Sequence, residues 1–117
     1  MDTNDMQPTL FDAPLPPIQQ VRTRRNETTR EKFLRFHTLN PHVYARLRDV
    51  SLAMRRRGLT HWGGRAAYEI VRFQGMLSTT GNSYKLPNIF APHYTRLLME
   101  QEPELVGFFR TCKLRRP

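Results

Sequence analysis

The chain has 117 residues, with nineteen Lys and Arg against ten Asp and Glu, and a formal net charge of +9. This length allows one domain, and the lone Cys112 excludes a disulfide framework or a four-cysteine zinc site. No apolar run is long enough to span a bilayer and no secretory signal opens the chain, so we expect a cytoplasmic protein.

The charge is unevenly distributed along the chain. Residues 1–20 carry a net charge of −3, residues 21–57 carry +8 and residues 58–117 carry +4. Most of the cations are arginines, whose guanidinium binds phosphate through two parallel hydrogen bonds. A nucleic acid is therefore the expected partner; the alternative is a basic surface that only keeps the protein in solution.

Residues 1–26 are predicted to form a disordered arm, because four prolines lie among polar residues and the apolar residues are too scattered for a core-facing side. Within this arm, Gln7-Pro8-Thr9-Leu10-Phe11 resembles the short peptide by which bacterial polymerases and repair proteins bind the replication sliding clamp. The resemblance implies that Gln7, Leu10 and Phe11 are the clamp-binding anchors. Pro8 departs from the leucine often found at that position, and a chance match is the alternative.

Residues 27–112 are predicted to form the folded body. Thr28 and Glu31 have the spacing of a capping box, which predicts a helix over 29–39. Asn40 as N-cap and Pro41 in the first turn predict a second helix that runs to about Arg57 and stops at Gly58.

A third helix is predicted over residues 65–74, with its alanines, Ile70, Val71 and Phe73 facing the core. Arg65, Tyr68, Glu69 and Arg72 then form an outward stripe, which is the spacing of a DNA recognition helix. An ordinary amphipathic surface helix has the same spacing.

Residues 76–86 alternate apolar and polar around Gly81-Asn82 and predict a β-hairpin with Lys85 near its tip. A helix from Pro92, a short final helix containing Leu105, Phe108 and Phe109, and a basic tail over 113–117 complete the prediction. The expected fold is mainly α, with four to five short helices, one small hairpin and a helix-turn-helix or winged-helix arrangement. Trp62 is expected to be a core anchor.

Residues 36–110 resemble a group of small proteins encoded by bacteriophages and prophages. The shared features are Asn40-Pro41-His42-Val43-Tyr44, the glycine-rich entry to the third helix, the run from Tyr94 to Leu105, and Gly107-Phe108-Phe109. The resemblance implies a phage protein acting in a bacterial host cell, and it supplies no catalytic residues.

No enzyme, cofactor or metal site is predicted. A nuclease would need clustered carboxylates for divalent metal, and the body offers Glu69 and a set at Glu100, Glu102 and Glu104 that more simply balance nearby arginines. The four histidines lack a metal-binding spacing.

The expected function is that of a DNA-binding accessory protein docked on the host sliding clamp. The alternatives are an inhibitor of a host replication or defence protein and, least favoured, a metal-dependent nuclease using Glu69. The candidate nucleic-acid contacts are Arg22, Arg24, Arg25, Arg46, Arg48, Arg55, Arg56, Arg57, Arg65, Tyr68, Arg72, Lys85, Lys113, Arg115 and Arg116.

Overall fold

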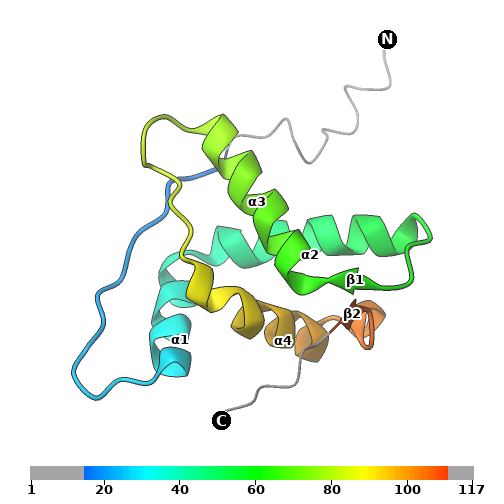
Figure 1. The fold of residues 1–117 in the computed structure, drawn as a ribbon, viewed down its shortest axis with the longest axis horizontal. Helices are drawn as coiled ribbons and strands as arrows, with labels where there is room; N and C mark the ends of the chain where they lie inside the picture. The colour runs from blue at the N-terminus through cyan, green and yellow to red at the C-terminus, as the bar shows by residue number, and fades with distance from the viewer. Residues whose placement is uncertain (1–14, 111–117) are drawn as a thin grey trace.

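The computed structural model describes residues 15–110, and within them the chain is mainly helical, as predicted (Figure 1). Two two-residue strands pair in parallel, with Trp62 opposite Phe109. None of the described helices is long and apolar enough to cross a membrane. The elements in chain order are α1 (Thr29–Leu39), α2 (Pro41–Arg56), β1 (Trp62–Gly63), α3 (Gly64–Ser78), the 3₁₀ helix η2 (Asn88–Phe90), α4 (Ala91–Gln101), the 3₁₀ helix η3 (Pro103–Leu105) and β2 (Phe109–Arg110).

The predicted capping box starts α1. The Thr28 hydroxyl accepts a hydrogen bond from the Glu31 backbone N–H at 3.1 Å, and the Glu31 carboxylate accepts one from the Thr28 N–H at 2.8 Å. The two bonds satisfy donors that the first turn leaves without helical partners. The prediction of this helix and its start is confirmed.

Asn40 is the N-cap residue of α2 and Pro41 opens the helix, as predicted, but the Asn40 side chain makes no capping hydrogen bond. The Asn40 carboxamide is fully buried; it accepts from the Gln19 N–H at 2.7 Å and donates to the carbonyls of Gln19 at 2.8 Å and Phe36 at 3.0 Å. It therefore joins the segment before α1 to the α1–α2 corner. At the other end of α2, Gly58 has a φ of 103°, a conformation that glycine adopts without strain.

Residues 15–26 pack against the body, so the expectation of a disordered arm is wrong for this part. Leu15 and Ile18 are buried, the Ile18 N–H donates to the Ser83 carbonyl at 2.8 Å, and the Leu15 N–H donates to the Ser78 hydroxyl at 3.3 Å. These contacts are between segments more than sixty residues apart and could not be read from local composition. Residues 1–14 and 111–117 lie outside the described part of the chain.

Aromatic rings hold the four helices together. Phe33 of α1 meets Tyr94 of α4 edge-on with centroids 4.7 Å apart, and Phe36 lies 4.7 Å from Phe90. Aliphatic side chains such as Val43 and Val71, both fully buried, extend this core between α2 and α3. Such buried rings contribute both area and preferred ring geometry.

The hairpin predicted over 76–86 is wrong. Residues 76–78 form the last turn of α3, and the following residues run as turn and loop with no strand pairing. The alternation was real, since Tyr84 and Leu86 are buried and Lys85 is exposed, but it places two side chains in the core from a loop. The wing of a winged helix is therefore absent from residues 76–86.

The end of the described chain also differs from prediction. The final helix is reduced to η3, and Phe109 lies in β2. Phe108 and Phe109 are both buried, and Trp62 packs against Phe108 with ring centroids 6.3 Å apart. Trp62 itself is only half-buried, so it lies at the edge of the core that it was expected to anchor. The Trp62 N–H donates to the Phe108 carbonyl at 3.0 Å, which ties the entry of α3 to this end of the chain.

Candidate nucleic-acid interface

The residues predicted to contact nucleic acid do not gather on one surface. The clamp-peptide residues Gln7, Leu10 and Phe11, and the tail residues 113–117, lie outside residues 15–110. The remaining twelve candidates are distributed over the loop before α1, the length of α2, α3 and the loop before η2. Each region therefore has to be judged by its own contacts.

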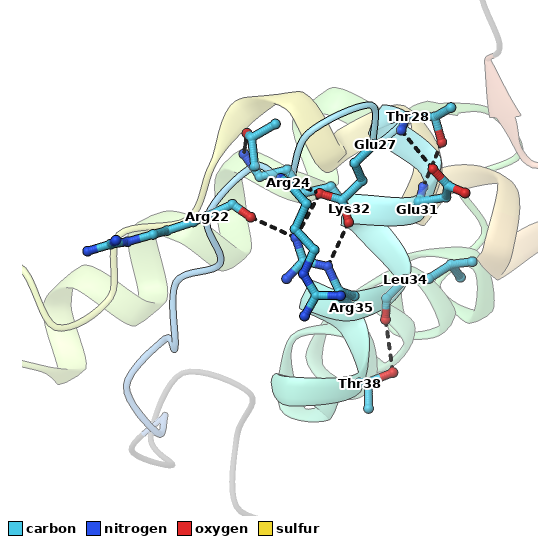
Figure 2. A network of polar contacts seen from close by, with 10 residues as sticks. Arg22, Arg24, Glu27, Thr28, Glu31, Lys32, Leu34, Arg35 and Thr38 are labelled. Atoms are coloured by element: carbon cyan, nitrogen blue, oxygen red, sulfur yellow. Dashed lines mark hydrogen bonds and ion pairs between the residues drawn. The ribbon is translucent and has the colours of Figure 1, made fainter.

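Glu27 connects the loop before α1 to that helix through hydrogen bonds. Figure 2 shows the Glu27 carboxylate accepting hydrogen bonds from Arg35 Nε at 2.6 Å, from Arg35 Nη2 at 2.7 Å and from the Arg24 backbone N–H at 2.9 Å. Arg35 also donates to the Arg22 carbonyl at 2.6 Å. The hydrogen bonds from Arg35 make the largest contribution and the bond from the Arg24 backbone the next largest, and they lower the pKa of Glu27 to about 2. Glu27 is therefore ionised at neutral pH and holds the loop in place.

This network uses mainly the charge of Arg35, while the charge of Arg24 also helps to lower the pKa of Glu27. The side chains of Arg22, Arg24 and Arg25 are exposed. None of these three forms an ion pair with a carboxylate of residues 15–110. The loop therefore presents three guanidiniums from a backbone that is already ordered.

Two further arginines, on α1 and α4, were not among the predicted contacts. His93 of α4 stacks on Phe33 of α1 with centroids 5.2 Å apart. Burial lowers the pKa of His93, and the charges of Arg96 and Arg30 lower it further, which places a guanidinium from each helix near this imidazole. Neither arginine forms an ion pair within the described part of the chain.

Arg30 lies in the first turn of α1, five residues after Arg25. We call the arginines carried by the loop before α1, by the first turn of α1 and by α4 the α1 basic surface; its members are Arg22, Arg24, Arg25, Arg30 and Arg96.

A second group of cations lies at the other end of the molecule, at the C-terminus of α2 (Figure 1). Arg55 and Arg57 are exposed there, but Arg56 donates to Glu104 at 2.5 Å, and this bond lowers the pKa of Glu104. Further back on α2, Arg48 contacts Asp49 at 3.2 Å. Carboxylates thus offset part of the charge at this end.

Arg46 and Tyr68 are not surface contacts, which corrects two predictions. Arg46 is only 9 % exposed within the packed face of α2. Tyr68 is 1 % exposed, and its hydroxyl donates to the Pro87 carbonyl. Burial raises the pKa of Tyr68, so it remains a neutral hydrogen-bond donor.

The predicted recognition stripe of α3 is engaged within the protein. Arg72 donates to Glu69 at 2.8 Å, to the Leu86 carbonyl at 2.8 Å and to the Asn88 side chain. Arg65 lies 3.8 Å from the same Glu69 carboxylate. Arg72 therefore fixes the loop before η2, and Glu69 is occupied by two guanidiniums.

The prediction placed the wrong side of α3 against the core. Phe73, expected inside, is 61 % exposed, whereas Gln74 and Gly75 are buried. The reason is the loop residue Tyr84, which lies against Gly75 so closely that an added Cβ would be 2.0 Å from the ring. This contact turns Phe73, Met76 and Leu77 toward solvent, where all three are more than half exposed.

Lys85 is exposed in the loop that follows, and its carbonyl accepts a hydrogen bond from the Gln20 side chain at 2.5 Å. Its neighbours in the sequence are neutral, and within residues 15–110 no hydrogen bond or ion pair joins its side chain to the α1 basic surface. Within residues 15–110, no group of three His, Cys, Asp or Glu side chains is placed to hold a metal ion.

A pocket of about 390 Å³ opens between the loop and α1, and its lining combines two guanidiniums with aliphatic side chains. It is lined by Arg24, Leu34, Arg35, Thr38 and Leu39. Figure 2 labels the first four of these residues. Because Arg35 is held by Glu27, Arg24 is the cation of this pocket that forms no ion pair. The pocket thus lies beside the α1 basic surface and shares Arg24 with it.

In comparisons with known proteins, no family, no curated protein and no solved structure matches the chain. The site's own geometry is therefore the basis for a functional assignment.

Proposed function

We propose that the protein is a non-enzymatic DNA-binding accessory protein and that DNA binds at the α1 basic surface. The observation that carries this proposal is the presence on and around α1 of five arginines from a loop and two helices, none of which forms an ion pair with a carboxylate in residues 15–110. Guanidiniums without a paired carboxylate favour a phosphate backbone, because each contact releases condensed counterions.

The fixed loop supports the same proposal. A flexible loop would lose conformational freedom when its arginines bind phosphate, which reduces affinity. Here the Glu27–Arg35 bonds and the bond from Lys32 to the Thr23 hydroxyl at 2.7 Å order the loop beforehand. Binding then needs only side-chain ordering.

We keep the helix-turn-helix interpretation of α2 and α3 only for the way the two helices are connected, and not for α3 as the helix that contacts DNA. The two helices are joined through Gly58 and the short β1 strand, and they pack on one another. However, the outer side of α3 carries Phe73, Met76 and Leu77, which offer no hydrogen bonds to base edges. We therefore place DNA against α1 rather than α3.

We further propose that Gln7, Leu10 and Phe11 dock the protein on the bacterial sliding clamp, in keeping with a phage protein that acts on host replication. Adjacent leucine and phenylalanine side chains fill one apolar pocket, and the glutamine amide fixes the register. These residues lie outside the described part of the chain, so this proposal rests on the motif.

DNA binding is tested by fluorescence anisotropy with labelled duplex and single-stranded oligonucleotides at 50 and 200 mM salt. If five arginines each neutralise a phosphate, the affinity for duplex falls roughly 500-fold over this range, since the slope is about −0.9 per phosphate contact. No binding to either oligonucleotide at 50 mM salt would contradict the proposal. It would favour the alternative that this surface binds an acidic host protein as an inhibitor.

Clamp docking is tested by pull-down with purified clamp. The double change Leu10→Ala with Phe11→Ala should abolish capture and leave DNA affinity unchanged, because the two anchors contribute no charge. Met6→Ala, an apolar change outside the motif, is the matched control and should retain capture. Capture that survives the double change would exclude the motif.

A further inference from the structure

The C-terminal half of α3 exposes an apolar stripe. Phe73, Met76 and Leu77 are 61 %, 57 % and 72 % exposed. Their spacing of three and four residues puts them side by side on one face of the helix. Single exposed apolar residues are common on protein surfaces, but a contiguous group of large ones marks a site that another apolar group covers. We call these three residues the α3 apolar stripe.

The N-terminal segment joins the body beside this stripe. The Leu15 N–H donates to the hydroxyl of Ser78, the last residue of α3, and the Leu15 side chain is buried. Leu77 immediately precedes Ser78, and Phe73 lies five residues back, about 7.5 Å along a helix axis. Leu15, the residue that follows residues 1–14, therefore lies at the end of the helix that carries the stripe.

The segment is long enough to reach the stripe. Phe11 is four residues before Leu15, so it lies up to about 14 Å from Leu15 along an extended chain. That reach covers the whole stripe. Leu10 and Phe11 are also an adjacent pair of large apolar residues within residues 1–14, whereas Met1 and Met6 stand singly.

We propose that Leu10 and Phe11 dock on the α3 apolar stripe of their own chain. A linker of three residues holds them at an effective concentration in the millimolar range, so even a weak contact is populated. A second copy of the chain is a poorer occupant, because three side chains per copy bury less than the ~1,000 Å² that a stable interface needs.

The docking has a regulatory consequence that rests on the proposed function. The same two side chains are the proposed clamp anchors, so the stripe and the clamp compete for them. The apparent clamp affinity is then the intrinsic affinity multiplied by the undocked fraction of the segment. Docking itself does not depend on the clamp.

The direct test is NMR of the full chain without clamp, with the methyl groups of Met76 and Leu77 as reporters. Leu10→Ser with Phe11→Ser should shift both reporters, whereas Gln7→Ala should leave them in place because docking uses only the apolar pair. Val106, which is 69 % exposed at the opposite end of the fold, serves as a reporter that should not move. Unchanged Met76 and Leu77 resonances in the double variant would overturn the proposal.

Two further outcomes separate the possible occupants. Reporter shifts that depend on protein concentration, together with a dimer in sedimentation, would overturn the proposal in favour of a second copy. Phe73→Ser with Leu77→Ser should raise clamp affinity by the reciprocal of the undocked fraction. If the NMR shifts are found but the clamp binds no variant, the docking stands and the clamp assignment fails.

Discussion

The surroundings of α1 and the outer side of α3 present opposite chemistry. Around α1, five arginines from three segments lie without paired carboxylates in the described chain, on a loop fixed by Glu27. On α3, the arginines are tied to Glu69, and the outward residues beyond them are Phe73, Met76 and Leu77. The α1 basic surface is therefore suited to binding phosphate, and the α3 apolar stripe is suited to binding an apolar peptide.

The difference shows that the number of cations on a helix does not locate a nucleic-acid site. Arg65 and Arg72 have the spacing of a recognition helix. However, Arg65 is paired with Glu69, and Arg72 donates hydrogen bonds to Glu69 and to the loop before η2. What matters is whether a neighbouring carboxylate already compensates the guanidinium. Binding to DNA would otherwise have to break an existing pair.

The largest change in the free energy of unfolding is expected on α3, where the structure buries a side that the sequence predicted to be exposed. Tyr68→Ala removes a fully buried ring and its hydroxyl bond to Pro87, so it should lower the free energy of unfolding by about 3–5 kcal/mol. Phe73→Ala on the outer side should change it by no more than ~0.5 kcal/mol. Urea denaturation of both variants measures the two changes in the free energy of unfolding. Equal losses would mean that the two sides of α3 are assigned incorrectly.

Asn40→Ala should have the next largest effect. It removes three hydrogen bonds from a buried carboxamide and leaves the Phe36 carbonyl with fewer partners, a loss of about 1–3 kcal/mol. Because two of these bonds hold Gln19, the segment before α1 should also become more sensitive to protease. Gln20→Ala, which removes one exposed bond to Lys85, is the control. An unchanged cleavage rate in Asn40→Ala would show that this residue does not anchor the segment.

Acid should destabilise the protein in two stages. Burial lowers the folded-state pKa of His37, His42 and His93 below 6.5, so the unfolded chain binds more protons and stability falls as pH drops below 6.5. The lowered pKa of Glu27, about 2, adds stability that is present above 4.5 and is lost as pH falls toward 2.

The first stage is checked by urea unfolding at pH 7.5, 6.0 and 5.0. His93→Gln should reduce the pH dependence of the free energy of unfolding, because a neutral residue then replaces an imidazole that resists protonation near Arg30 and Arg96. A free energy that is constant between pH 7.5 and 5.0 would contradict this explanation.

The sequence predicted those parts of the fold that depend on neighbouring residues. Thr28 and Glu31 start α1, Pro41 opens α2 and Gly58 ends it, because caps and backbone constraints act within a few residues. Alternation before and after Gly81 was read as a hairpin because the pattern alone does not show whether a partner strand exists. A hydrophobic pattern predicts which residues are buried, but it does not predict which element packs against them.

The errors come from contacts between distant segments. The orientation of α3 depends on Tyr84 against Gly75, and the packing of Leu15 depends on Ser78. The candidate site shows the same division: Arg22, Arg24 and Arg25 were found as a charge run, but the approach of Arg30 and Arg96 depends on the packing of α1 on α4. Local pattern could not bring those two residues together.

The most direct test of the account compares two pairs of arginines that differ in place but not in charge. Arg30→Gln with Arg96→Gln removes two cations from the α1 basic surface, and Arg55→Gln with Arg57→Gln removes two from the end of α2. The measurement is the slope of log affinity for duplex DNA against log salt concentration. We predict that the first pair reduces the slope by about 2 and that the second leaves it nearly unchanged. A slope reduced only by the second pair would place DNA at the end of α2 and contradict the account.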